Sequence, residues 1–177
     1  MKKYGEEYAF EVHEIPAHMV REAAISSTRI RKTLLEGDVA NAALLLGRPY
    51  SISGIVVEGQ KLGRTLGYPT ANLQPHESSQ LIPANGIYVV RVQIGDSLHD
   101  AMLSIGTRPT VNNDGSVTIE ACIFDFNQDL YAQEIAIHFV QRMRDELKFE
   151  SLEELKSAIA NDEIQARQIL SSNPSLS

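Results

Sequence analysis

The sequence predicts a mainly β domain, an antiparallel barrel or sandwich, with a short αβ segment before it and helices after it. Three observations predict this class. Short segments alternate apolar and polar residues, turn signals separate them, and a capping box opens a helical pattern near the C-terminal end. With 177 residues and 43% hydrophobic side chains, the chain can bury the core of one such domain.

The αβ segment precedes Gly47. Residues 8–14 alternate like a strand. Ser26 or Ser27 offers an N-cap for a helix that runs through Leu35. Asp38 offers another for a helix over 39–46, which Gly47 ends. We therefore expect a domain boundary near Gly47.

The β body follows. We expect strands at 51–59, 86–94, 98–105, 116–126 and 134–141, with turns at Gly95-Asp96 and Asp114-Gly115. A glycine-rich basic loop spans 60–67, and an extended segment follows it. Ser151, with Glu154 three residues later, is a capping box that predicts the C-terminal helical part.

Charge and cysteine content narrow the function. Lys and Arg number 16 against 23 Asp and Glu, a net charge of −7, which argues against nucleic acid as the main partner. The single cysteine, Cys122, excludes an intrachain disulfide and fits the cytoplasm. No apolar run has the length of a membrane span, so we expect no membrane partner. The P-loop, G-x-G-x-x-G and H-R-D motifs are all absent from the sequence.

The segment from Gly59 to Asn72 is the first candidate site. Its glycines let backbone N–H groups approach an anion, and Lys61 and Arg64 add positive charge. Thr70 and Asn72 are two residues apart, so in an extended segment they face one way and offer the oxygen ligands that Mg²⁺ prefers. From composition alone, a solvated surface loop is an equally good interpretation.

Other candidates are weaker by themselves. Glu120 lies on a largely apolar strand face and could act as a general base, or could be a solvated carboxylate at a rim. Thr107 and Arg108 follow a strand and could meet a ligand or simply form a turn. Residues 142–149 could cover a flat ring or serve as a charged connector.

Together these segments resemble the riboflavin kinase module of bacterial bifunctional riboflavin kinase/FMN adenylyltransferases. The resemblance covers roughly residues 47–170, and its matching stretches occur in family order: Leu46-Gly47-Arg48-Pro49-Tyr50, Gly63-Arg64-Thr65-Leu66-Gly67-Tyr68-Pro69-Thr70-Ala71-Asn72, Gly86-Ile87-Tyr88, Ile105-Gly106-Thr107-Arg108-Pro109-Thr110, Thr118-Ile119-Glu120, Asp129-Leu130-Tyr131 and Leu147-Lys148-Phe149.

The resemblance implies a six-stranded antiparallel Greek-key barrel that uses Mg-ATP to phosphorylate riboflavin to FMN. It implies that Glu120 is the catalytic base and that Mg²⁺ binds Thr70 and Asn72. ATP is expected to contact Gly59, Lys61, Gly63, Arg64, Gly67, Tyr68, Thr70 and Asn72. Riboflavin is expected to contact Thr107, Arg108, Arg142, Arg144 and Phe149.

The segment before Gly47 departs from the family pattern. Residues 25–31 resemble an ATP-contacting motif of the adenylyltransferase module, but no His-x-Gly-His motif precedes them. We therefore expect residues 1–46 to be a remnant of that module and 47–172 to be the kinase domain, a monomer or weak homo-oligomer. Three alternatives stay open: a catalytically silent flavin- or nucleotide-binding module, a structural β-barrel interaction module, and an FMN adenylyltransferase, the last in a full-length parent only.

Overall fold

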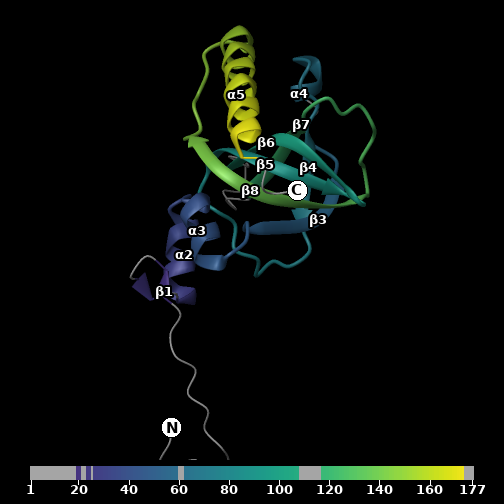
Figure 1. Ribbon diagram of the computed structural model, residues 1–177. Helices are drawn as coiled ribbons and strands as arrows, with labels where there is room; N and C mark the ends of the chain where they lie inside the picture. Colours follow the sequence, from purple (N-terminus) through teal and green to yellow (C-terminus); the bar gives the residue numbers. More distant parts are fainter. Residues whose placement is uncertain (1–18, 21–22, 25, 60–61, 108–116, 174–177) are drawn as a thin grey trace, which may run out of the picture.

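The centre of the molecule is a closed barrel of antiparallel strands (Figure 1). The structure is a computed structural model that describes residues 19–20, 23–24, 26–59, 62–107 and 117–173. Its barrel strands are β3 (Ser51–Val57), β4 (Ala71–Pro75), β5 (Gly86–Ile94), β6 (Ser97–Thr107), β7 (Val117–Ile123) and β8 (Glu134–Arg144). They pair in the order β3-β4-β7-β6-β5-β8, and β3 pairs with β8 to close the barrel. The predicted six-stranded antiparallel barrel is confirmed.

The strand order makes the barrel a Greek key. Strands β5, β6 and β7 pair in sequence order, and β8 returns to lie beside β5. Strand β4 takes the other side of β7. Because every strand has a partner on both sides, the barrel leaves no free edge.

The interior of the barrel is filled by the apolar residues of the alternating pattern. Tyr88, Val90 and Val92 point inward from β5, and Ile135, Ile137 and Phe139 point inward from β8. Phe139 meets the ring of Tyr88 edge to face at 5.3 Å between centroids. The alternation therefore sets which face of each strand is the core.

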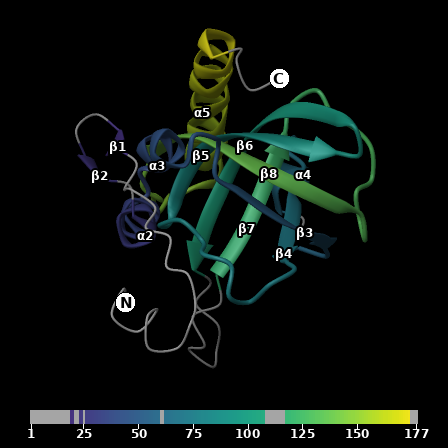
Figure 2. The same cartoon turned by 60° about the horizontal axis from the view of Figure 1, so that its bottom comes forward.

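Two helices pack on this same core at one side of the barrel (Figures 1 and 2). They are α2 (Ser27–Leu35) and α3 (Val39–Leu46). Ser26 caps α2 by accepting from the backbone N–H of Arg29 at 3.2 Å. Asp38 caps α3, and Gly47 ends it in the left-handed conformation at φ +70°, as predicted. The helices contribute Leu34, Val39 and Ala42 to the barrel core.

A longer helix, α5 (Leu152–Ser172), covers part of the outer barrel face. Ser151 caps it by accepting from the N–H of Glu154 at 3.1 Å, as the capping box predicts. A second apolar cluster lies between helix and strands and consists of Val89, Met102, Cys122, Phe124, Ala166 and Leu170. Where several C-terminal helices were expected, the described residues form one helix of 21 residues.

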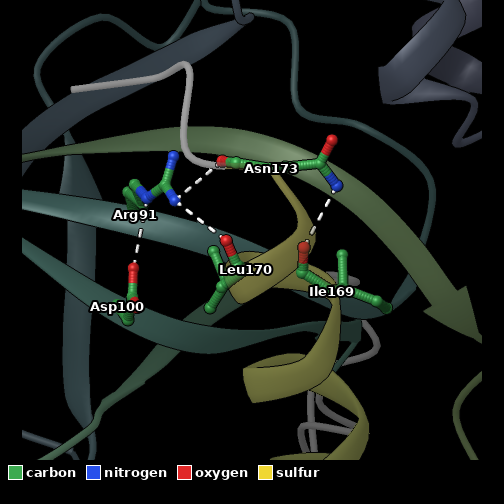
Figure 3. Close-up of polar contacts among 5 residues, drawn as sticks. All are labelled: Arg91, Asp100, Ile169, Leu170 and Asn173. Carbon is green, nitrogen blue, oxygen red and sulfur yellow. Dashed lines mark hydrogen bonds and ion pairs between the residues drawn. The ribbon is translucent and has the colours of Figure 1, made fainter.

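Arg91 fixes the C-terminal end of α5 to the barrel (Figure 3). Its Nη2 donates to the backbone carbonyls of Leu170 at 3.3 Å and Asn173 at 3.0 Å. Its Nε donates to Asp100 Oδ1 at 3.1 Å. A cation therefore donates to two backbone carbonyls at the C-terminal end of the helix, where the helix dipole favours positive charge.

The structure differs from the sequence prediction at several boundaries. Strand β4 and the short helix α4 (Leu62–Thr65) were not predicted as regular elements. Strand β8 extends to Arg144, so the start of the expected connector is strand. The strand expected at 8–14 and the turn at 114–115 lie outside the described residues, and a two-stranded hairpin, β1 (Met19–Val20) and β2 (Ala23–Ala24), precedes α2.

None of the helices in the described part of the chain is both long and apolar enough to cross a membrane.

Candidate active site

Two cavities lie on either side of the segment that leads into β4. The first, the barrel-end cavity, has a volume of about 680 Å³. It is lined by residues 56–59, 69–72 and 126–131, with Ala121 and Ile123. Several of these residues, including Val56, Ile123 and Leu130, belong to the barrel core, so one wall of the cavity is apolar.

The second, the helix-side cavity, lies between the outer barrel face and α5 and has a volume of about 400 Å³. Its apolar walls include Leu66, Met102, Leu147, Phe149, Leu155 and Ile159. Its polar lining includes Ser104, Glu120, Arg144, Glu146 and Asp162. A cavity with apolar walls and a few placed polar groups is typical of a site for a flat organic ligand.

The strand register places Asn72, Glu120, Ser104 and Arg144 in one row across the barrel. Asn72 on β4 pairs with Glu120 on β7, and Glu120 pairs with Ser104 on β6. Ser104 pairs with Ile87 on β5, which pairs with Arg144 on β8. Residues directly opposite each other in antiparallel strands share a face. The row therefore runs along the outer barrel face from Asn72 to Arg144.

Thr70 marks the point where the two cavities meet, because it lines both. Its hydroxyl donates to Glu120 Oε2 at 3.4 Å. Ala71, the next residue, packs toward the barrel core, so Thr70 and Asn72 lie on the opposite, outer face, as their spacing predicts. The arrangement gathers a hydroxyl, an amide and a carboxylate at one junction.

Gly59 is required by the close approach of Asn72. A Cβ at Gly59 would lie 2.0 Å from Asn72 Nδ2 and 2.5 Å from its Cγ. Any larger residue at 59 would therefore displace the Asn72 amide. The oxygens of Thr70 and Asn72, next to the Glu120 carboxylate, form a donor set of the kind that Mg²⁺ prefers.

The residues predicted to contact ATP divide between the two cavities. Gly59 lines the barrel-end cavity, whereas Gly63 and Tyr68 line the helix-side cavity. Gly67 forms an exposed turn at φ +86°. Lys61 and the side chain of Arg64 lie outside the described residues. Burial raises the pKa of the Tyr68 phenol, and the nearby carboxylate of Glu163 raises it further.

The residues predicted to contact riboflavin are also divided. Arg144 and Phe149 line the helix-side cavity. Arg142 and Thr107 are not part of its lining and are bridged by Asn85 instead. The guanidinium of Arg142 donates to the backbone carbonyl of Asn85 at 2.5 Å, and the amide of Asn85 donates to the Thr107 hydroxyl at 2.9 Å. Arg108 lies outside the described residues.

Burial shapes the acidity of two other groups in the helix-side cavity. It raises the pKa of the Glu146 carboxyl, although nearby Arg144 opposes the shift. It also raises the pKa of the Cys122 thiol to about 11, so the thiol stays neutral near pH 7. A neutral buried thiol is unreactive, as the interpretation of Cys122 as a small apolar residue predicts.

Sequence reasoning missed several lining residues. Ser104 and Asp162 were assigned no role, and neither were residues 126–128 of the barrel-end cavity. Glu146 and residues 129–131 lie in segments that were singled out in the sequence, but they received no individual role. Asp162 had one usable signal: it shares a helical face with Ile159 and Ala166, where a charge is unusual. Ser104 had none, because its place in the row follows from strand pairing.

The family model and the similar curated proteins indicate the same family. The riboflavin kinase (Flavokinase) family model matches residues 46–170. Bifunctional riboflavin kinase/FMN adenylyltransferases are similar: that of Listeria monocytogenes is 39% identical over 89% of this chain and 50% of its own length. The Escherichia coli K12 enzyme is 39% identical over 95% and 53%, and that of Pseudomonas fluorescens 43% over 82% and 46%. The chain thus spans about half the length of these relatives.

Solved structures share the fold. A Streptococcus pneumoniae crystal structure described as a macrolide-efflux protein superposes with a TM-score of 0.84 at 40% identity, over 94% of this chain and 54% of that one. Riboflavin kinase from Trypanosoma brucei superposes with a TM-score of 0.51 over 70% of this chain and 80% of its own; at 22% identity it supports the fold alone. The family match covers most of the chain, including both cavities and their junction. The chain therefore belongs to the riboflavin kinase family.

Proposed function

We propose that this chain transfers the γ-phosphoryl group of ATP to the 5′-hydroxyl of riboflavin, and that the two cavities hold the two substrates. ATP would occupy the barrel-end cavity and riboflavin the helix-side cavity. The observation that carries this proposal is the junction: Thr70 lines both cavities and its hydroxyl lies 3.4 Å from the Glu120 carboxylate. A phosphoryl group has to pass between two substrates at such a point.

Glu120 is the proposed general base. The 5′-oxygen forms a bond to the γ-phosphorus, and the bond from that phosphorus to the β–γ bridging oxygen breaks, which releases ADP. The hydroxyl proton passes to the Glu120 carboxylate as the new bond forms. Phosphoryl transfer depends mainly on positioning and charge neutralisation, so the residues around Glu120 act chiefly by holding the substrates in line.

Thr70 and Asn72 are the proposed holders of Mg²⁺. Both lie on the outer face beside Glu120 and offer a hydroxyl and an amide oxygen. Bound there, Mg²⁺ would offset the charge of the ATP phosphates. Gly59 supports the site because it leaves the space that the Asn72 amide occupies. We also propose that the segment from 60 to 67 covers the phosphates.

Riboflavin is the proposed occupant of the helix-side cavity because apolar and polar lining residues match different parts of the molecule. Phe149, Leu147 and Ile159 offer apolar surface to a fused ring system. Arg144 offers hydrogen-bond donors to the carbonyl oxygens of that ring system, and Glu120 lies three strands away in the same row. We further infer a cytoplasmic enzyme, active as a monomer or weak homo-oligomer.

The direct test is to incubate the protein with riboflavin, ATP and Mg²⁺ and to separate the flavins by chromatography. We expect FMN to accumulate with the release of one ADP per FMN. A silent binding module or a purely structural barrel would give no FMN. An accumulation of FAD would instead show that the adenylyltransferase activity named for the relatives is present in this chain.

A further inference from the structure

Helix α5 carries a buried carboxylate into the wall of the helix-side cavity. The Asp162 residue is 4% exposed, yet it lines the cavity together with Arg144. Its two carboxylate oxygens accept from Arg144 Nε at 2.9 Å and from Nη2 at 2.6 Å. This two-pronged geometry fixes the plane of the guanidinium as well as its position.

The guanidinium of Arg144 keeps donors for a ligand. Its Nη1 also donates to the backbone carbonyl of Asp145 at 2.8 Å. A guanidinium has five N–H groups, so the hydrogen bonds described here use only part of its capacity. The Arg144 side chain is 24% exposed and lines the cavity. Its other N–H groups are therefore held in a fixed orientation at the cavity wall.

Stability alone is a weak reason for this pair. Burying a carboxylate and a guanidinium costs much of what their attraction returns, and an apolar pair of similar size often serves the fold equally well. A second Arg–Asp pair already ties α5 to the barrel, because Arg167 donates to both carboxylate oxygens of Asp125 at 2.8 and 3.1 Å. Unlike that pair, the Arg144–Asp162 pair faces a cavity.

We propose that Asp162 is a positioning residue for flavin binding. It orients the Arg144 guanidinium so that the remaining N–H groups donate to a carbonyl oxygen of the flavin ring. This inference rests on the proposed function, which places riboflavin in the helix-side cavity. Arg144 and Glu120 lie three strands apart in one row and both line the helix-side cavity. A ring held at Arg144 can therefore direct its ribityl chain toward Glu120 within the same cavity.

The test compares two Asp→Asn substitutions that each remove a carboxylate from an Arg–Asp pair of α5. Asp162→Asn changes the pair at the cavity. Asp125→Asn changes the pair outside the lining of the helix-side cavity, at a left-handed residue (φ 55°) that asparagine accommodates. We expect Asp162→Asn to raise the riboflavin KM and Kd about 10-fold, the scale of one charge-assisted hydrogen bond. The ATP KM and the kcat at saturating riboflavin should change little, and Asp125→Asn should leave the riboflavin KM unchanged.

A flavin analogue separates orientation from general damage. In 2-thioriboflavin and 4-thioriboflavin, sulfur replaces a ring carbonyl oxygen and is the weaker acceptor. Wild-type protein should bind at least one of them less tightly than riboflavin, and Asp162→Asn should lose that preference. A folded Asp162→Asn protein that keeps both the riboflavin KM and the preference would overturn the role of Asp162.

A second variant keeps the proposal testable if Asp162→Asn does not fold. Arg144→Met/Asp162→Leu replaces the pair by apolar residues of similar size, which should keep α5 docked. We expect this protein to melt near the wild-type temperature and to lose riboflavin affinity, and an unchanged affinity would overturn the proposal. The proposed function fails in a different way: wild-type protein would then neither bind riboflavin nor make FMN.

Discussion

At the residue scale, Glu120 carries the chemistry that we propose. Glu120→Gln keeps the shape and hydrogen-bonding capacity of the side chain but removes the base. We expect kcat to fall about 100-fold or more, the usual contribution of a general base, while Mg-ATP and riboflavin still bind. Steady-state kinetics measure the fall in kcat, and binding titrations check that Mg-ATP and riboflavin still bind. A glutamine variant with a near wild-type kcat would refute the assignment.

Asn72 offers a second test at this scale. Asn72→Ala removes one oxygen ligand, so we expect the reaction to need a higher Mg²⁺ concentration. Gly59→Ala should act in the same direction, because its Cβ would displace the Asn72 amide. The measurement is initial rate against Mg²⁺ concentration at fixed ATP. If both variants keep the wild-type dependence on Mg²⁺, Asn72 does not hold the metal.

At the element scale, Arg91 sets the stability of helix α5. Arg91→Met removes one hydrogen bond to Asp100 and two to the carbonyls at the helix end. Hydrogen bonds from a charged group contribute about 2 kcal/mol, so we expect a loss of at least that order in the free energy of unfolding. Urea denaturation measures it. Lys32→Met, which breaks an exposed ion pair with Glu36, is the control and should change stability little.

Some of the helices and strands could be predicted from the sequence and others could not. The N-caps at Ser26, Asp38 and Ser151 and the alternation of β5 were predictable because each depends on neighbours along the chain. Strand β4 was missed because it has five residues and ends in Pro75, so it carries little alternating signal. Helix α4 was missed because it has only four residues and lies in a segment whose glycines are typical of a loop.

For the site, local motifs found Thr70, Asn72 and Glu120, and the family resemblance gave them roles that stay predictions. The row from Asn72 through Ser104 to Arg144 could not be predicted, because it depends on how distant strands pair when the barrel closes. Arg142 and Arg144 show the same limit. Both are arginines of the same predicted segment, two residues apart, yet only Arg144 lines the helix-side cavity.

At the scale of the whole molecule, the expected boundary near Gly47 separates the residues that we propose for catalysis from those before them. It does not separate two hydrophobic cores. Leu34 and Val39 lie before it but are buried in the barrel core. A chain that starts at Leu44 loses both, and each buried Leu or Val contributes about 1.5–3 kcal/mol. We expect this chain to be less stable than one that starts at Ser26, yet to make FMN while it is folded. Urea denaturation and FMN assays at low temperature check this, and a folded chain from Leu44 without kinase activity would contradict the boundary.

Helix α5 is attached to the barrel unevenly along its length. Its buried residues, Asp162, Ala166 and Leu170, all lie in its second half, and Arg91 holds that end. The first half, 152–161, contains no buried residue and covers the helix-side cavity with Leu155 and Ile159. Without a ligand, this half should open locally more often, because few apolar contacts oppose its opening. We therefore expect its amide hydrogens to exchange with deuterium faster than those of 163–172, and bound riboflavin to slow the exchange of the first half selectively.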